Sequence, residues 1–145
     1  MAPDPSRVSL ELGETDRDLT DLLDDEIYAF NVADTGIDDG RMLTVRANDY
    51  SGSLVGGLSG WTWGDCGYVD VLWVRENHRG LGLGTRLLVA AQDEALLRGC
   101  SQMVLSTHSF QAPDFYRKHG YQEVGRTEDY PRGYTQIHLR KVFGP

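Results

Sequence analysis

The sequence lacks any long hydrophobic run. No stretch approaches the roughly 18 consecutive apolar residues that a membrane-spanning helix needs. The first ten residues, MAPDPSRVSL, also lack the basic region and following apolar region of a secretory signal peptide. We therefore expect no membrane association and a cytoplasmic location.

Cysteine is scarce, with only Cys66 and Cys100 in the chain. A disulfide framework would need more cysteines in a secreted protein, so we expect two reduced, buried thiols. No histidine, cysteine or carboxylate group has the spacing of metal ligands. The sequence therefore predicts no metal site.

Basic charge is also limited, and the acidic charge is unevenly distributed. The first 40 residues hold twelve of the 22 acidic residues and only two arginines. Without a basic stripe that could neutralise several phosphates, nucleic acid is not an expected partner. An acidic N-terminal third favours a cationic small molecule, unless these acids form an ordinary solvated helix face.

Hydrophobic periodicity and turn residues indicate a single mixed α/β domain, residues 1–145, around one sheet. Aspartates near position 16 and Gly36 delimit a first helix, a second helix ends at about Arg98 before Gly99, and a short third helix begins near Pro113. Strands are predicted at 7–12, 41–47, 53–63, 68–76, 103–106, 121–127 and 134–142.

The most informative segment is HRGLGLGTRLL, residues 78–88, which lies between a predicted strand and a helix. A nucleotide-binding P-loop is excluded because no Lys-Ser/Thr pair follows a glycine. A dinucleotide fingerprint is excluded because the glycines follow the spacing GxGxG, and residues 100–104 contain no acid for a ribose. Glycines at a helix N-terminus still suit an anion, since the backbone N–H groups and helix dipole converge there. The alternative is a tight turn without a ligand.

Two motifs resemble those of one family, the GNAT (general control non-repressible-related) N-acetyltransferase superfamily. The segment LWVRENHRGLGLGTRLL resembles the family's acetyl-CoA signature, [QR]xxGx[GA] after a strand, and APDFYRKHGY resembles its late motif AxxxYxxxGF. The matching residues are Arg79, Gly82, Gly84, Ala112, Tyr116, Gly120 and Tyr121. Ser109 departs from the asparagine common in the family.

The resemblance implies a strongly twisted, mixed but mostly antiparallel sheet of six to seven strands. About four helices would flank it, and the central strands would splay in a V. It also implies that acetyl-CoA places its pyrophosphate on the glycine loop and its pantetheine arm along 72–74, with the Leu72 N–H stabilising the oxyanion. The implied cofactor-binding residues are Leu72, Trp73, Val74, Arg79, Gly80, Leu81, Gly82, Leu83, Gly84, Thr85, Ala112 and Phe115.

Acid–base chemistry is assigned to two residues. The resemblance implies that the Tyr116 hydroxyl protonates the departing CoA thiolate; the alternative is a core tyrosine. Asp70 is the candidate base because burial within YVDVLWV would raise the pKa of its carboxyl, and alternation would put it on one face with Tyr68 and Leu72. A structural carboxylate is the alternative, and Glu26 is a second candidate base or amine-binding group.

Aromatic residues are candidates for the acceptor pocket. Trp61 and Trp63 share a strand face, Tyr68 is expected across the hairpin, and their rings could contact a cation. His108 follows a strand at its carboxyl end and is a further candidate. The alternatives are an ordinary aromatic core and a capped loop histidine.

These observations predict an N-acetyltransferase that moves the acetyl group of acetyl-CoA to a primary amine by direct attack in a ternary complex. A small cationic acceptor is expected. Protein or peptide amines, a non-catalytic acyl-CoA-binding regulatory module and a ligand-free interaction domain are the alternatives, and homodimerisation is left open.

Overall fold

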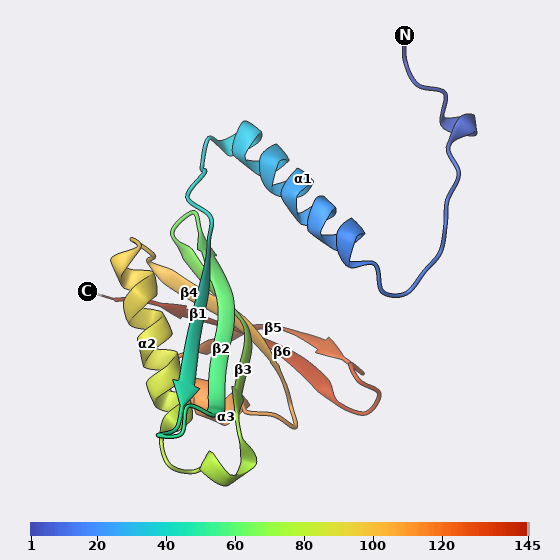
Figure 1. Ribbon diagram of the computed structural model, residues 1–145. Coiled ribbons are helices and arrows are strands. Elements are labelled where there is room, and N and C mark those ends of the chain that lie inside the picture. Colours follow the sequence, from blue (N-terminus) through green and yellow to red (C-terminus); the bar gives the residue numbers. More distant parts are fainter. Residues whose placement is uncertain (145) are drawn as a thin grey trace. The chain divides into compact units, whose positions relative to one another are not determined.

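The computed structural model describes residues 1–144 and forms two compact units, one spanning Met1–Gly36 and the other beginning at Ile37 (Figure 1). The first unit contains a short 3₁₀ turn, Pro5–Arg7, and helix α1, Arg17–Thr35. The predicted strand at 7–12 is wrong, because residues 8–12 form no ladder and their apolar side chains are exposed. Alternation alone does not make a strand; the backbone groups also need a hydrogen-bonded neighbour.

Helix α1 begins and ends where its capping residues predict. The Asp16 carboxylate accepts a hydrogen bond from the Leu19 N–H at 3.0 Å, which satisfies one open donor of the first turn. Gly36 adopts a left-handed conformation, φ 73°, and its N–H bonds the Val32 carbonyl. The helix boundaries therefore follow from local chemistry.

The second unit is built on a six-stranded mixed sheet with the order β1-β2-β3-β4-β6-β5 (Figure 1). Only β3 and β4 pair in parallel; the other four pairs are antiparallel. The strands are β1 (Arg41–Asn48), β2 (Leu54–Trp63), β3 (Cys66–Val74), β4 (Gln102–His108), β5 (Gln122–Glu128) and β6 (Thr135–Val142). The helices are α2 (Leu83–Leu97) and α3 (Pro113–Lys118), with a 3₁₀ turn at Glu76–His78.

The core lies between α2 and one face of the sheet. Helix α2 packs on β1, β2 and β3, and it buries a stripe at helical spacing that includes Leu87, Leu88, Ala91 and Ala95. The main fold prediction is confirmed: one open, mixed, mostly antiparallel sheet. Residues 1–144 contain six strands, within the predicted six to seven, and three α-helices rather than about four.

A β-bulge distorts β3 where the fold opens. Ser59 faces Val71 across the β2–β3 ladder and Gly60 faces Val69, which leaves Asp70 as the extra residue. Gly60 is required at this point because a Cβ there would lie 1.9 Å from the Tyr68 carbonyl oxygen. The parallel ladder to β4 ends at the same level, with the pair of Val69 and Leu105. Beyond this pair β3 and β4 no longer pair with each other, which produces the expected splay.

Candidate active site

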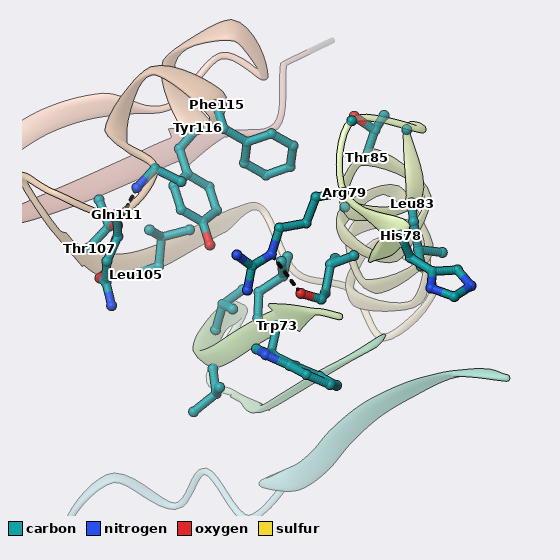
Figure 2. Close-up of a pocket in the computed structure, with 18 of the residues that line it drawn as sticks. Trp73, His78, Arg79, Leu83, Thr85, Leu105, Thr107, Gln111, Phe115 and Tyr116 are labelled. Atoms are coloured by element: carbon teal, nitrogen blue, oxygen red, sulfur yellow. Dashed lines mark hydrogen bonds between the residues drawn. The ribbon is translucent and has the colours of Figure 1, made fainter. Parts of the chain in front are cut away.

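The gap beyond the β3–β4 ladder forms a cavity of about 880 Å³. Strands β3 and β4 supply two of its walls, and the glycine loop, the start of α2 and helix α3 supply the rest (Figure 2). Its lining includes most predicted cofactor-binding residues: Leu72, Trp73, Val74, Arg79, Gly80, Gly82, Leu83, Gly84, Thr85, Ala112 and Phe115. Leu81 is 75% exposed and is not among the lining residues.

The glycine loop has the shape of an anion cradle. Gly80 and Gly82 have positive φ values of 75° and 81°, with open space where a Cβ would lie. Gly82 caps α2 without a side-chain hydrogen bond, and the first intrahelical bond runs from the Arg86 N–H to the Gly82 carbonyl. The N–H groups that precede Arg86 in this turn are therefore open donors at the positive end of the helix dipole.

Polar side chains border this cradle. The Arg79 Nε donates to the Val74 carbonyl at 2.9 Å, which fastens the loop to the end of β3 (Figure 2). Thr85 Oγ1 lies 3.1 Å from His119 Nε2, and the His119 ring packs against Phe115 with centroids 4.9 Å apart. The donor set, open N–H groups with a hydroxyl and a guanidinium, fits the pyrophosphate of acetyl-CoA.

Tyr116 has the position expected of a proton donor. Its ring is only 7% exposed and packs against Phe115 and Tyr121, whereas its hydroxyl is directed into the cavity (Figure 2). Burial raises the pKa of the Tyr116 hydroxyl, so the phenol keeps its proton at neutral pH. Tyr116 is thus a core residue that also lines the cavity, and its role as the acid stays a prediction.

Asp70 lines the cavity, but its predicted environment is wrong. The side chain is exposed rather than buried. The predicted shared face also fails. Tyr68 pairs with Trp61, and Leu72 pairs with Leu58 on the opposite face, because the bulge at Asp70 interrupts the alternation.

The predicted acceptor residues lie outside the cavity lining. Trp61 stacks on Tyr68 with centroids 4.4 Å apart, which confirms the expected contact across the hairpin. Trp63 faces Cys66 in the ladder, and its indole N–H donates to the Ile37 carbonyl at 2.9 Å. Glu26 lies on α1, in the first unit, and its role stays a prediction.

His108 belongs to an aromatic cluster at the end of β4. Its ring stacks on Phe110 and meets Tyr130 edge-on, and Phe110 in turn contacts Tyr134. The His108 Nδ1 lies 2.9 Å from the Tyr130 carbonyl oxygen, which can only accept, so Nδ1 carries a proton. Phe110 lines the cavity, which connects this cluster to it.

Sequence reasoning missed the β4 side of the cavity. Besides the predicted residues, the lining of the cavity includes Val69 and Val71 on β3, His78 before the glycine loop, and a group on and after β4: Leu105, Ser106, Thr107, Phe110 and Gln111. The available signal was the position of 105–111 after a central strand, since residues that follow a strand at its carboxyl end gather at the site of many α/β folds.

Other sequence expectations concern thiols, metals and membranes. Both cysteines are free; Cys100 is buried as expected and Cys66 is half-buried, and burial raises the pKa of each thiol. Within residues 1–144 no group of three or more histidine, cysteine or acidic side chains is arranged to hold a metal ion. In the same part of the chain no helix is both long and apolar enough to cross a membrane.

Comparison with known proteins identifies the family. The model of the acetyltransferase (GNAT) family matches residues 9–121, so the chain belongs to this family of acetyltransferases. It is 43% identical over 94 residues to a blasticidin-S acetyltransferase of Streptomyces morookaense, covering 62% of this chain and 67% of that protein. An acetyltransferase structure from Agrobacterium tumefaciens is 30% identical, with a TM-score of 0.85 over 94% of this chain and all of that one. An aminoglycoside 6'-N-acetyltransferase in complex with coenzyme A shares the fold, with a TM-score of 0.63, 22% identity and coverage of 72% and 74%.

Proposed function

We propose that this protein transfers the acetyl group of acetyl-CoA to a primary amine of a small cationic molecule, by direct attack within a ternary complex. One observation carries the proposal: the open N-terminus of α2 and the Tyr116 hydroxyl face the same cavity, which lies where β3 and β4 separate. The family match spans residues of both units, which supports one acetyltransferase domain over 1–145.

The chain's own groups fit acetyl-CoA along the cavity. The open N–H groups at the start of α2 would hold its pyrophosphate, as a helix N-terminus holds phosphate. Beyond Val69, β3 has no ladder partner on β4, so backbone groups between Val69 and Val74 can bond an extended amide-containing arm, whereas the Val74 carbonyl already accepts from Arg79. When bound, acetyl-CoA supplies a thioester with a carbonyl that an amine can attack.

The reaction needs a neutral amine, a stabilised oxyanion and a protonated leaving group. We assign the oxyanion to the Leu72 N–H, in the stretch of β3 that no longer pairs with β4, and the leaving-group proton to Tyr116. Asp70 borders the cavity from the bulge and is our candidate to take a proton from the amine, directly or through water, with Glu26 as the second candidate.

A small cationic acceptor is favoured by two observations. Two relatives carry names that describe acetylation of small amine-bearing antibiotics, blasticidin S and aminoglycosides. Two aromatic groups, the Trp61–Tyr68 stack and the cluster around His108, offer ring faces that attract cations and planar rings. We also propose a cytoplasmic location, in keeping with the two free thiols.

A binding test and an acceptor screen examine the proposal. Acetyl-CoA at 100 times its Kd should stabilise the protein by about 2.7 kcal/mol, and no thermal shift at millimolar acetyl-CoA would refute it. The screen then measures free-thiol release with 1,5-diaminopentane, spermidine, lysine, kanamycin, blasticidin S and a peptide with a free N-terminus. Faster release with the peptide than with any small amine would favour a protein acetyltransferase.

The same screen separates an enzyme from a regulatory module. Binding of acetyl-CoA without thiol release from any amine would indicate a cofactor sensor. An enzyme should lose rate in Tyr116→Phe and in Asp70→Asn; unchanged rates in both variants would show that the acid and base assignments are wrong.

A further inference from the structure

A row of three polar side chains leads from the cavity to the surface across strands β4, β6 and β5. Ser106 Oγ lies 2.8 Å from His138 Nδ1, and His138 Nε2 lies 3.1 Å from Thr127 Oγ1. Ser106 lines the cavity, the His138 ring is half-buried, and Thr127 is exposed. Both nitrogens of one imidazole are therefore bonded to hydroxyls, one of them at the cavity and the other at solvent.

The strand register explains this continuity. Ser106 and His138 are directly opposite each other in the β4–β6 ladder, and Gly125 faces His138 in the β5–β6 ladder. The imidazole lies against β5 at Gly125, where a Cβ would be 3.6 Å from the ring, an ordinary van der Waals contact. The ring then reaches Thr127, two residues further along the same strand.

The inner end of the row lies where the two central strands separate. Val69 and Leu105 form the last pair of the parallel ladder, so Ser106 on β4 and Asp70 on β3 are the first residues beyond it. Both border the cavity. An amine that enters between the separated strands would meet the Ser106 hydroxyl at this point.

We propose that Ser106, His138 and Thr127 form a proton relay that carries the proton of the acceptor ammonium from the cavity to solvent before the amine attacks; this rests on the proposed acetyltransferase function. The proton that the nitrogen loses after the attack is left to Asp70. The ammonium gives a proton to Ser106 Oγ as the Ser106 proton moves to His138 Nδ1. The proton on His138 Nε2 moves to Thr127 Oγ1, and Thr127 releases its own to water. The relay keeps its charge, the amine keeps the electron pair of the broken N–H bond, and that pair attacks the thioester carbonyl.

Either arrangement of the neutral imidazole fits the observed bonds. With the proton on Nε2, Ser106 donates to Nδ1 and Nε2–H donates to Thr127; with the proton on Nδ1 both bonds reverse. Passage of one proton through the row converts the first arrangement into the second, so the imidazole returns to the first tautomer before the next proton passes.

Charged or titratable side chains lie near the relay on each of the strands β4, β5 and β6. On β6, Arg140 lies two residues after His138, and on β4, His108 lies two residues after Ser106. On β5, Arg126 and Glu128 flank Thr127, and alternation turns them to the other face, where Arg126 pairs with Glu123 and Glu128 bonds Thr135.

The test compares pH profiles of full-length variants with the fastest acceptor of the amine panel. His138→Gln keeps polar atoms but cannot relay a proton, so kcat should fall at least tenfold at pH 7. The loss should shrink toward pH 10, because an alkylamine with a pKa near ~10 then loses its proton without help. A purely structural role would reduce kcat by the same factor at every pH, and that result would overturn the relay.

Matched hydroxyl variants localise the effect. Ser106→Ala and Thr127→Val should repeat the pH-dependent loss, whereas Ser106→Thr and Thr127→Ser should restore most of the rate. Thr135→Val removes a hydroxyl from the same hairpin outside the row and should keep the wild-type profile. An acetylated Ser106 trapped by mass spectrometry would overturn the relay, since the serine would then be a nucleophile.

Failure of the relay is distinguishable from failure of the proposed function. If wild-type protein acetylates an amine and all three relay variants keep its rate at pH 7, only the relay is wrong. If wild-type protein acetylates no amine in the panel, the proposed function fails and the relay fails with it.

Discussion

Replacing Tyr116 with phenylalanine removes one hydroxyl and little else. The ring is 7% exposed, and its contacts with Phe115 and Tyr121, at centroid distances of 5.1 and 5.8 Å, do not involve the oxygen. Within residues 1–144 the Tyr116 hydroxyl makes no hydrogen bond to the protein, so no buried partner is left unsatisfied. The free energy of unfolding should therefore change by less than about 1 kcal/mol.

The effect on catalysis should be much larger than the effect on stability. General acid catalysis contributes roughly 10²- to 10⁴-fold. A thiolate with a pKa near ~8.5 is a good leaving group, so we expect the lower end. Tyr116→Phe should thus reduce kcat about 100-fold, equivalent to about 2.7 kcal/mol, while KM for acetyl-CoA changes less than about threefold.

Steady-state thiol release and thermal denaturation of the same samples check this prediction, with Tyr50→Phe, at a fully exposed turn tyrosine, as the control. Burial raises the pKa of Tyr116, so its proton should be retained and wild-type kcat should not decline between pH 7 and pH 9 through loss of this acid. Unchanged kcat in Tyr116→Phe, or a loss that matches a loss of folded protein, would refute the assignment.

Three further predictions concern backbone geometry and the core. Gly82→Ala strains a residue at φ 81° by about 1–2 kcal/mol, and it should raise the Kd of acetyl-CoA, measured by calorimetry, about five- to thirtyfold. The control is Gly99→Ala, at φ 86° beyond the other end of α2, which should cost similar stability without changing the Kd of acetyl-CoA. Gly60→Ala should destabilise the fold by at least about 3 kcal/mol in urea, and a wild-type midpoint would contradict the close approach at the bulge. Tyr121→Phe removes a 2.8 Å bond to the buried Gln92 and should cost about 1–3 kcal/mol, most of it recovered by adding Gln92→Leu. Burial, the larger cause, and the neighbouring Tyr116, the smaller, raise the pKa of Tyr121 above its unfolded value. The stability of the wild-type protein should therefore hold below about pH 10 and fall above it, and the fall should be less steep in Tyr121→Phe.

The parts of the site that sequence predicted are local in the chain. The glycine loop, the start of α2 and Pro113 at the start of α3 are each determined by a few consecutive residues. Caps and positive φ angles depend on neighbours within one helical turn, so residue types at fixed spacing carry enough information. The motif containing Tyr116 is similarly compact.

Asp70 shows where local reasoning fails. Strict alternation places it on one face with Tyr68 and Leu72, but the bulge reverses the alternation after Val69. The cause is on the neighbouring strand, where Gly60 lets the Tyr68 carbonyl approach. A glycine inside an otherwise regular strand was the available signal, since such glycines mark bulges and close backbone contacts.

The polar row was beyond prediction for a related reason. Ser106 and Thr127 lie 32 and 11 residues from His138, and only the strand order β4-β6-β5 brings the three side chains into line. The contrast between local and long-range determinants also separates the cofactor-binding part of the site from the acceptor-binding part. A cofactor held by backbone N–H groups requires glycines at fixed positions, and this leaves a pattern in the sequence. An acceptor recognised by side chains of separate strands leaves none, so the acceptor must be found by experiment.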